Sequence, residues 1–146
     1  MVELANFEFV GSKKSNGMVS MIAGKKLVLK GEAIRHFDLK SSDIGRNSGM
    51  TAKIAFDVDG KKMYICRQKG EVGAALGGNL SRVEIYNSGA CQKIMQIIER
   101  KLAGSGTVGF GIVEFDELAN GEPCIIVDLT SYTANSGVFV ESEVAE

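Results

Sequence analysis

The sequence predicts an α+β fold in which two βαββ units pack together as one domain. Apolar and polar residues alternate over 50–58 and a turn pair follows, which predicts an antiparallel hairpin at 50–67. Residues 107–129 have a similar outline, with a longer connection between their two strands. A short strand and a helix precede each hairpin, so both halves of the chain show the same order of elements. We interpret this order as an internal duplication.

The length and composition of the chain suit a single soluble domain. Its 146 residues are 45% apolar and 24% charged, which is typical of globular proteins and sufficient for a hydrophobic core. The apolar runs are too short for a transmembrane helix, and the first ten residues do not resemble a signal peptide. We divide the chain into an N-terminal hairpin (5–23), unit one (25–68), a flexible linker (69–80), unit two (81–129) and a C-terminal tail (130–146).

Unit one begins with a strand at 25–29 and continues with a short helix at 31–38. In this helix Ala33, Ile34 and Phe37 form the inward side. This helix is only about two turns long.

The hairpin of unit one is predicted by strict alternation. Its first strand places one set of apolar side chains on one face, namely Met50, Ala52, Ile54, Phe56 and Val58. Asp59-Gly60 is the pair that most readily adopts positive φ at both centres of a two-residue turn. Residues 61–67 then return as the partner strand.

Unit two contains a strand at 81–86 and a longer amphipathic helix at 88–103. The apolar stripe of this helix comprises Ala90, Cys91, Ile94, Ile97, Ile98 and Leu102. Asn87 or Ser88 can cap the first turn, and Gly104 can end the helix.

The hairpin of unit two is less regular. Val113 and Phe115 lie on the face opposite to that of the preceding apolar residues, which indicates a bulge or bend. Asn120-Gly121 is again a turn pair, and Pro123 is compatible only with a strand start or an edge.

Few residues suggest catalysis. Cys66, Cys91 and Cys124 are too widely spaced for a disulfide framework or a paired-ligand metal site, so we expect reduced, mostly buried thiols in a cytoplasmic protein. His36 is the only histidine, which rules out a His-based metal cluster within one chain. We therefore expect no enzymatic activity, no catalytic residues and no cofactor or metal.

The charges are unevenly distributed along the chain. Residues 1–70 contain 13 Lys and Arg against 7 Asp and Glu, whereas residues 71–146 contain 4 against 11. This imbalance indicates either a basic face for an anionic partner or two halves that attract each other. The candidate nucleic-acid or anion-binding residues are Lys25, Lys26, Lys30, Arg35, Lys53, Lys61, Lys62 and Arg67.

Residues 24–67 resemble the AbrB/MazE-like swapped-hairpin domain. The matching residues are Leu27, Leu29, Ile34, Arg35, Leu39 and Asp43, followed by the hairpin at 50–67, although Lys30-Gly31 stands where that family usually has a proline. The resemblance implies an intertwined homodimer that binds DNA through basic residues on and near the paired hairpins. Carried over to this chain, it implicates Lys25, Lys26, Lys30 and Arg35.

These observations favour a non-enzymatic, DNA-contacting regulator that uses its basic N-terminal half. A lysine-fringed hairpin can enter a major groove as a β-ribbon or follow a phosphate backbone. The alternative is a protein that binds a small, nucleotide-like anion or another protein, as a sponge or inhibitor. An enzyme using Asp, Lys or Cys is a third alternative. We expect no membrane partner.

Overall fold

The computed structural model describes residues 18–22, 25–45, 47–70, 73–99 and 107–134. Two α-helices, two short 3₁₀ helices and ten strands are found in these residues. In chain order they are β1 (Val19–Ile22), β2 (Lys26–Leu29), α2 (Glu32–Phe37), η1 (Ser41–Asp43), β3 (Met50–Asp57), β4 (Lys62–Lys69), β5 (Ala74–Asn79), β6 (Arg82–Tyr86), α3 (Ser88–Ile98), β7 (Thr107–Phe110), β8 (Val113–Glu117), β9 (Pro123–Asp128), η2 (Leu129–Ser131) and β10 (Tyr132–Ala134).

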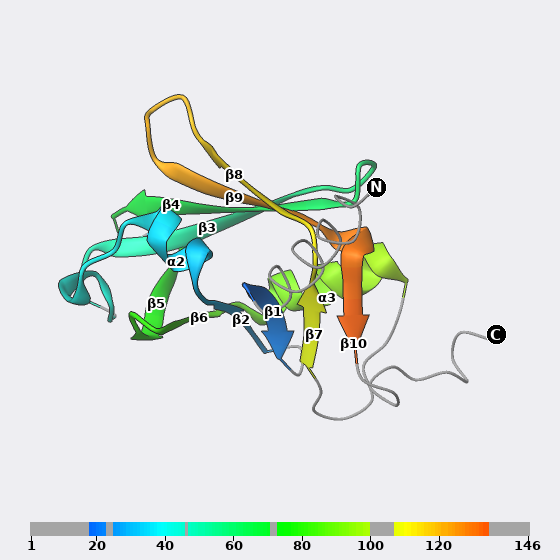
Figure 1. Cartoon of the computed structure of the whole chain (residues 1–146), viewed down its shortest axis with the longest axis horizontal. Helices are drawn as coiled ribbons and strands as arrows, with labels where there is room; N and C mark the ends of the chain where they lie inside the picture. Colours follow the sequence, from blue (N-terminus) through cyan, green and yellow to red (C-terminus); the bar gives the residue numbers. More distant parts are fainter. Residues whose placement is uncertain (1–17, 23–24, 46, 71–72, 100–106, 135–146) are drawn as a thin grey trace, which may run out of the picture.

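The strands of the described residues form one antiparallel sheet in the order β10-β7-β1-β2-β6-β5-β3-β4-β9-β8. The sheet curves into a half-barrel, with β3, β4, β8 and β9 above and the other strands below in the view of Figure 1. The chain passes directly from β7 to β8, and β9 leads back through η2 to β10. The Gly111 N–H donates to the Ser131 carbonyl at 3.1 Å, which links the β7–β8 connection to the β9–β10 connection.

The prediction of an α+β fold made of two βαββ units is wrong, because the described residues are mostly antiparallel sheet with few helices. β4 of unit one pairs with β9 of unit two, and β2 pairs with β6, so strands from both halves alternate in one sheet. Residues 74–79, expected in a flexible linker, form β5 between β6 and β3. Periodicity identifies a strand by its own residues, but it does not specify which strand lies beside it.

The hairpin predicted at 50–67 is confirmed, because β3 and β4 pair from Met50↔Lys69 to Asp57↔Lys62. The two-residue turn predicted for it is wrong. The connection spans residues 58–61, and its positive φ of 54° occurs at Lys61 instead of Asp59 or Gly60. The Asp57 carboxylate accepts a hydrogen bond from the Gly60 N–H at 3.0 Å, which stabilises this longer turn.

Both predicted helices exist, with different ends. α3 begins as predicted, because the Asn87 side chain accepts a hydrogen bond from the Ala90 N–H at 3.0 Å. It ends at Ile98 and not at 103, and the following Glu99 caps it with a left-handed φ of 58°. The stripe from Ala90 to Ile98 is buried, whereas Leu102 lies outside the described residues. The helix expected at 31–38 is α2.

The two helices and the inner face of the sheet share one hydrophobic core. The largest fully buried side chains include Phe37 of α2, Ile94 of α3 and Phe110 of β7. α3 lies behind β7 and β10 in Figure 1, and α2 lies near β9. Within the described residues, no helix is both long and apolar enough to cross a membrane.

Candidate nucleic-acid interface

Two neighbouring strands present polar side chains on the outer face of the sheet. In β2 and β6 the apolar residues Leu27, Leu29, Val83 and Ile85 point into the core, so the alternate residues, including the fully buried Val28, lie on the outer side. The register pairs Lys26 with Tyr86 and Val28 with Glu84. We call this surface the β2–β6 face and define it by Lys26, Arg82, Glu84 and Tyr86, with Lys30 directly after β2.

Four of these side chains form one network centred on Glu84. The Lys26 ammonium lies 3.3 Å from Glu84 Oε2 and donates to the Tyr86 hydroxyl at 3.2 Å. Arg82 Nε donates to Glu84 Oε2 at 3.1 Å, and the Tyr86 hydroxyl donates to Glu84 Oε1 at 3.0 Å. The carboxylate thus holds two cations and the tyrosine ring in fixed positions.

Tyr86 is exposed, at 59% of its maximum as a residue, although its hydroxyl is held by hydrogen bonds. The Lys26 ammonium lies 5.0 Å from the ring centroid but 3.2 Å from the hydroxyl, so it sits towards the edge of the ring. Gly77 of β5 lies beside this ring: a Cβ added there would come within 3.8 Å of Tyr86 Cε1. Gly77 therefore lets the ring of Tyr86 lie close to the β5 backbone.

The β5–β6 turn that carries this arrangement requires a second glycine. Gly78 has a φ of +81°, and an added Cβ would lie 2.2 Å from the Arg82 carbonyl oxygen. Any larger residue would clash with the β6 backbone at this point. The close approach keeps Arg82 and Tyr86 in register with β2.

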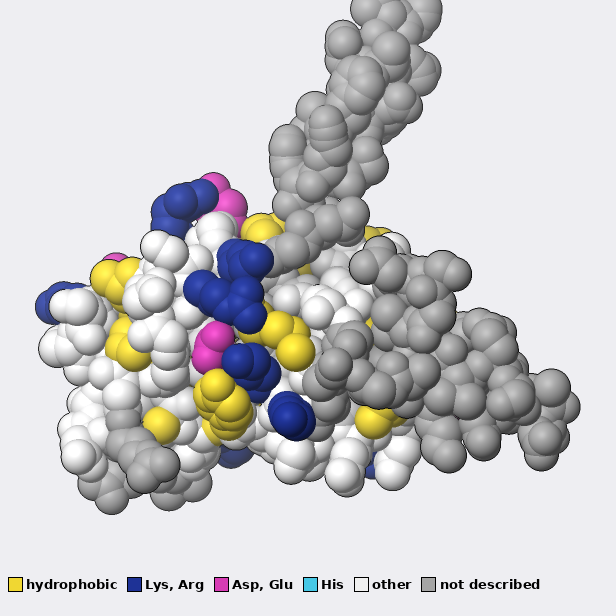
Figure 2. Space-filling view, turned by 90° about the horizontal axis from the view of Figure 1, so that it is seen from below, with side chains coloured by type: hydrophobic (Ala, Val, Ile, Leu, Met, Phe, Trp, Pro, Cys, Tyr) yellow, Lys and Arg dark blue, Asp and Glu magenta, His cyan; other side chains and the backbone are white. Residues whose placement is uncertain are grey.

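Hydrogen bonds within the network shift the ionisation of its members. The hydrogen bond to Tyr86, followed by those to Glu84, raises the pKa of Lys26 above its ordinary value. The hydrogen bond from Arg82 is the main cause that lowers the pKa of Glu84. Glu84 is therefore ionised and already paired at neutral pH, which leaves the cations in excess. Figure 2, a view from below, shows Lys and Arg side chains gathered in a band on this side of the molecule.

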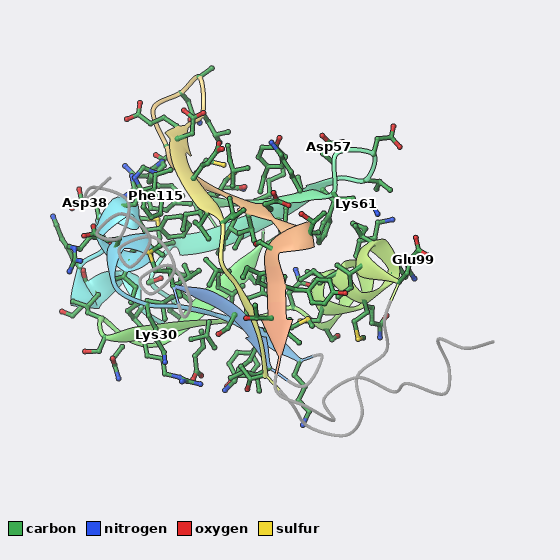
Figure 3. The ribbon with its side chains drawn as sticks, turned by 45° about the vertical axis from the view of Figure 1, so that its right-hand side comes forward. Lys30, Asp38, Asp57, Lys61, Glu99 and Phe115 are labelled. Atoms are coloured by element: carbon green, nitrogen blue, oxygen red, sulfur yellow. The ribbon has the colours of Figure 1, made fainter. Side chains whose placement is uncertain are left out.

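Of the eight residues that the sequence singled out, Lys26 and Lys30 share the outward side of β2, whereas Lys25, before the strand, has the same parity as the core-facing Leu27 and Leu29. Arg35 belongs to α2 and forms an exposed ion pair with Glu32 of the same helix at 2.8 Å. Lys61 and Lys62 lie at the tip of the β3–β4 hairpin, and Figure 3 shows Lys61 far from Lys30. These residues therefore do not form one patch.

Lys53 and Arg67 line a separate cavity on the outer side of β3 and β4. Arg67 is tied into the fold, because its Nε lies 2.8 Å from Glu122 Oε1 and its Nη1 donates to the Phe37 carbonyl at 2.6 Å. The β3–β4 hairpin is also not a free two-stranded ribbon, since β4 pairs with β9 from Lys62 to Cys66.

Some cations of the first half form ion pairs with carboxylates of the second half. Lys26–Glu84 and Arg67–Glu122 each join a cation of the first half to a carboxylate of the second half. Other cations are not used in this way: in the described part of the chain, no ion pair is formed by Lys25, Lys30, Lys53, Lys61 or Lys62. Internal attraction and outward-facing charge therefore coexist.

Sequence reasoning missed Arg82 and Tyr86. The signal was present, because Arg82, Glu84 and Tyr86 alternate with the buried Val83 and Ile85 and must share the outer face. The alternation alone does not identify a site, because it does not show that β6 lies beside β2.

The single histidine lies against β8 and β9. His36 Nε2 is 2.8 Å from the Asp116 carbonyl oxygen and 3.1 Å from that of Cys124, and the imidazole ring centroid is 4.9 Å from that of Phe115. His36 thereby connects α2 to these strands. Among the described residues, no group of three or more His, Cys, Asp or Glu side chains could hold a metal ion.

Comparisons with protein-family models, curated proteins and solved structures gave no match. The resemblance of residues 24–67 to the swapped-hairpin domain therefore stays a prediction.

Proposed function

We propose that this protein binds single-stranded nucleic acid on the β2–β6 face, as a binding protein without catalytic activity. The observation that carries the proposal is the exposed Tyr86, held by its hydroxyl between Lys26 and Glu84, with its ring close to the β5 backbone at Gly77. Proteins that bind single strands combine aromatic platforms for the bases with cations for the phosphates.

The ring favours a single strand over a duplex. A base can stack on a tyrosine only when it is not already stacked within a helix, and each such contact is worth about 1–3 kcal/mol. Because the network fixes the Tyr86 hydroxyl in the free protein, little side-chain entropy remains to be lost on binding.

The cations supply the affinity for phosphate. Lys30 is exposed and unpaired among the described residues, whereas Lys26 and Arg82 share Glu84. We therefore expect about two to three phosphate contacts, which correspond to a slope of roughly −1.4 to −2 for log affinity against log salt concentration.

Fluorescence anisotropy with labelled DNA and RNA single strands of about 12 nucleotides, over roughly 50–200 mM salt, tests the proposal. Tyr86→Ala should weaken binding by about 5- to 100-fold, while Tyr86→Phe should keep most of the affinity. Lys30→Gln should make the salt slope shallower by about 0.7. Lys61→Gln, at the distant hairpin tip, is the matched control and should change neither quantity.

Two results would overturn the proposal. One is the absence of binding to any single strand at the lowest salt concentration. The other is equal affinity of the wild type and Tyr86→Ala, since stacking would then contribute nothing. Comparison of DNA, RNA and duplex probes also identifies the preferred nucleic acid, and tighter binding to the duplex would contradict the role of the ring.

A further inference from the structure

A cavity of about 660 Å³ lies on the outer side of β3 and β4, and its volume is in the range of small-molecule sites. Its polar lining comes from Lys53, Tyr64, Gln68, Lys69 and Asn120, in addition to the paired Arg67 and Glu122. Three elements of the chain contribute: β3, β4, and the connection between β8 and β9.

The cavity exists because small side chains occupy the centre of this face. Lys53 is opposite Cys66, and Ala55 is opposite Tyr64, so a small residue alternates with a larger one on each strand. Cys66 is the residue of the floor nearest to the next strand, where Cys124 lies directly opposite it and is almost completely buried. The β8–β9 hairpin rises above the sheet in Figure 1, and its Leu118 and Asn120 form the opposing wall.

The Arg67–Glu122 ion pair holds that wall in place. Glu122 lies in the β8–β9 connection, and its carboxylate is 2.8 Å from Arg67 Nε of β4. Both side chains are mostly shielded, with 15% and 18% exposure. Since the two charges offset each other, this ion pair does not determine the net charge of the cavity lining.

Lys53 and Lys69 make the net charge of the lining positive. Neither has an ion pair within the described residues, and both line the cavity beside the neutral donors of Tyr64 and Gln68. The floor and wall add apolar surface from Ala55, Cys66 and Leu118. Ammonium groups beside an apolar floor suit a ligand that has a flat apolar body and an anionic oxygen group.

We propose that this cavity is a binding site for a small organic anion, a phosphate monoester or a carboxylate attached to an apolar ring. The site is distinct from the β2–β6 face, because none of its lining residues belongs to β2 or β6. The proposal therefore does not depend on nucleic-acid binding.

Thermal unfolding and isothermal titration calorimetry with a defined panel test the proposal. The panel contains nucleoside monophosphates, the uncharged nucleosides, aromatic carboxylates and inorganic phosphate. We expect at least one ring-bearing anion to raise the melting temperature and the matching uncharged compound to have no effect, because a ligand stabilises only the state that it binds. Nucleotides and carboxylates are separate arms, so the result also identifies the anionic group.

Three variants locate the binding. Lys53→Met keeps the aliphatic chain but removes the charge, and should weaken binding about tenfold. Ala55→Trp fills the cavity from an exposed position and should abolish binding while leaving the protein folded. Lys61→Met removes a cation from the same hairpin outside the cavity lining, and should bind like the wild type.

The proposal is overturned if no ring-bearing anion of the panel binds at millimolar concentration, or if Ala55→Trp binds the same anion as tightly as the wild type. Tyr86→Ala provides the cross-check with the nucleic-acid proposal: it should leave small-anion binding unchanged. A loss of anion binding in Tyr86→Ala would place the anion on the β2–β6 face and would also overturn the cavity site.

Discussion

Replacing Arg67 with methionine should lower the free energy of unfolding by about 3 kcal/mol. Arg67 connects three parts of the chain that are far apart in sequence. From β4, it pairs with Glu122 at 2.8 Å and donates to the carbonyl oxygens of Phe37 and Asp38 at 2.6 Å and 3.3 Å. The two carbonyls lie at the C-terminal end of α2, so Arg67 also caps that helix.

The magnitude follows from these contacts. A hydrogen bond that involves a charged group contributes about 1.5–3 kcal/mol, and the contributions of one side chain are not additive. Arg67 and Glu122 are 15% and 18% exposed, so water can replace only part of what is lost. Methionine also leaves the Glu122 carboxylate without its partner in a poorly solvated position. For a chain of this size, about 3 kcal/mol corresponds to a melting temperature lower by roughly 6–12 °C.

Urea denaturation followed by circular dichroism measures this difference by linear extrapolation. Glu122→Gln keeps an acceptor for Arg67 and should cost only about 1 kcal/mol. Arg67→Met combined with Glu122→Met should be more stable than Arg67→Met alone, because no unpaired carboxylate remains. Lys61→Met is the surface control and should stay within about 0.5 kcal/mol of the wild type. A loss of under about 1 kcal/mol for Arg67→Met would refute the reasoning.

Two further predictions concern sulfur chemistry and pH. Cys66 Sγ and Cys124 Sγ are 2.9 Å apart on paired strands, so copper–phenanthroline with oxygen should join them into a disulfide, seen by mass spectrometry as the loss of two hydrogens. The product should persist in Cys91→Ser and be absent in Cys66→Ser; an unchanged thiol count in the wild type would contradict the geometry. Because contacts in the folded protein lower the pKa of Glu84, their stabilisation is present above its ordinary value of 4.5 and is lost as the pH falls through the lowered pKa. The difference in melting temperature between wild type and Glu84→Gln should therefore shrink in acid, and a constant difference down to about pH 3 would count against the network.

Local features of this fold could be predicted because they depend on neighbouring residues. The alternation from Met50 to Phe56 predicts β3, and the apolar stripe and Asn87 cap predict the start and inner face of α3. Likewise, the face switch at Val113 corresponds to the break between β7 and β8 at residues 111–112. Each of these signals is contained within one turn or one strand.

Long-range features could not be predicted in this way. β5 consists of Ala74–Asn79, with adjacent glycines that are typical of loops, and its place in the sheet depends on contacts with β6 and β3. The β2–β6 face shows the same limit: Lys26 and Tyr86 are 60 residues apart, and only the sheet order brings them together. The candidate cations identified from the sequence include Lys26, but its partners Glu84 and Tyr86 could be found only from the sheet order.

The position of β1 has a consequence for biosynthesis. β1 lies between β2 and β7, so one of its two neighbours is the segment Thr107–Phe110. During translation, the edge of β1 that pairs with β7 stays unpaired with it until residues 107–110 have left the ribosome. Nascent chains that are stalled before residue 107 should therefore aggregate readily and require chaperones. Once residues 107–110 are available, β1 can pair on both sides and the sheet can assemble.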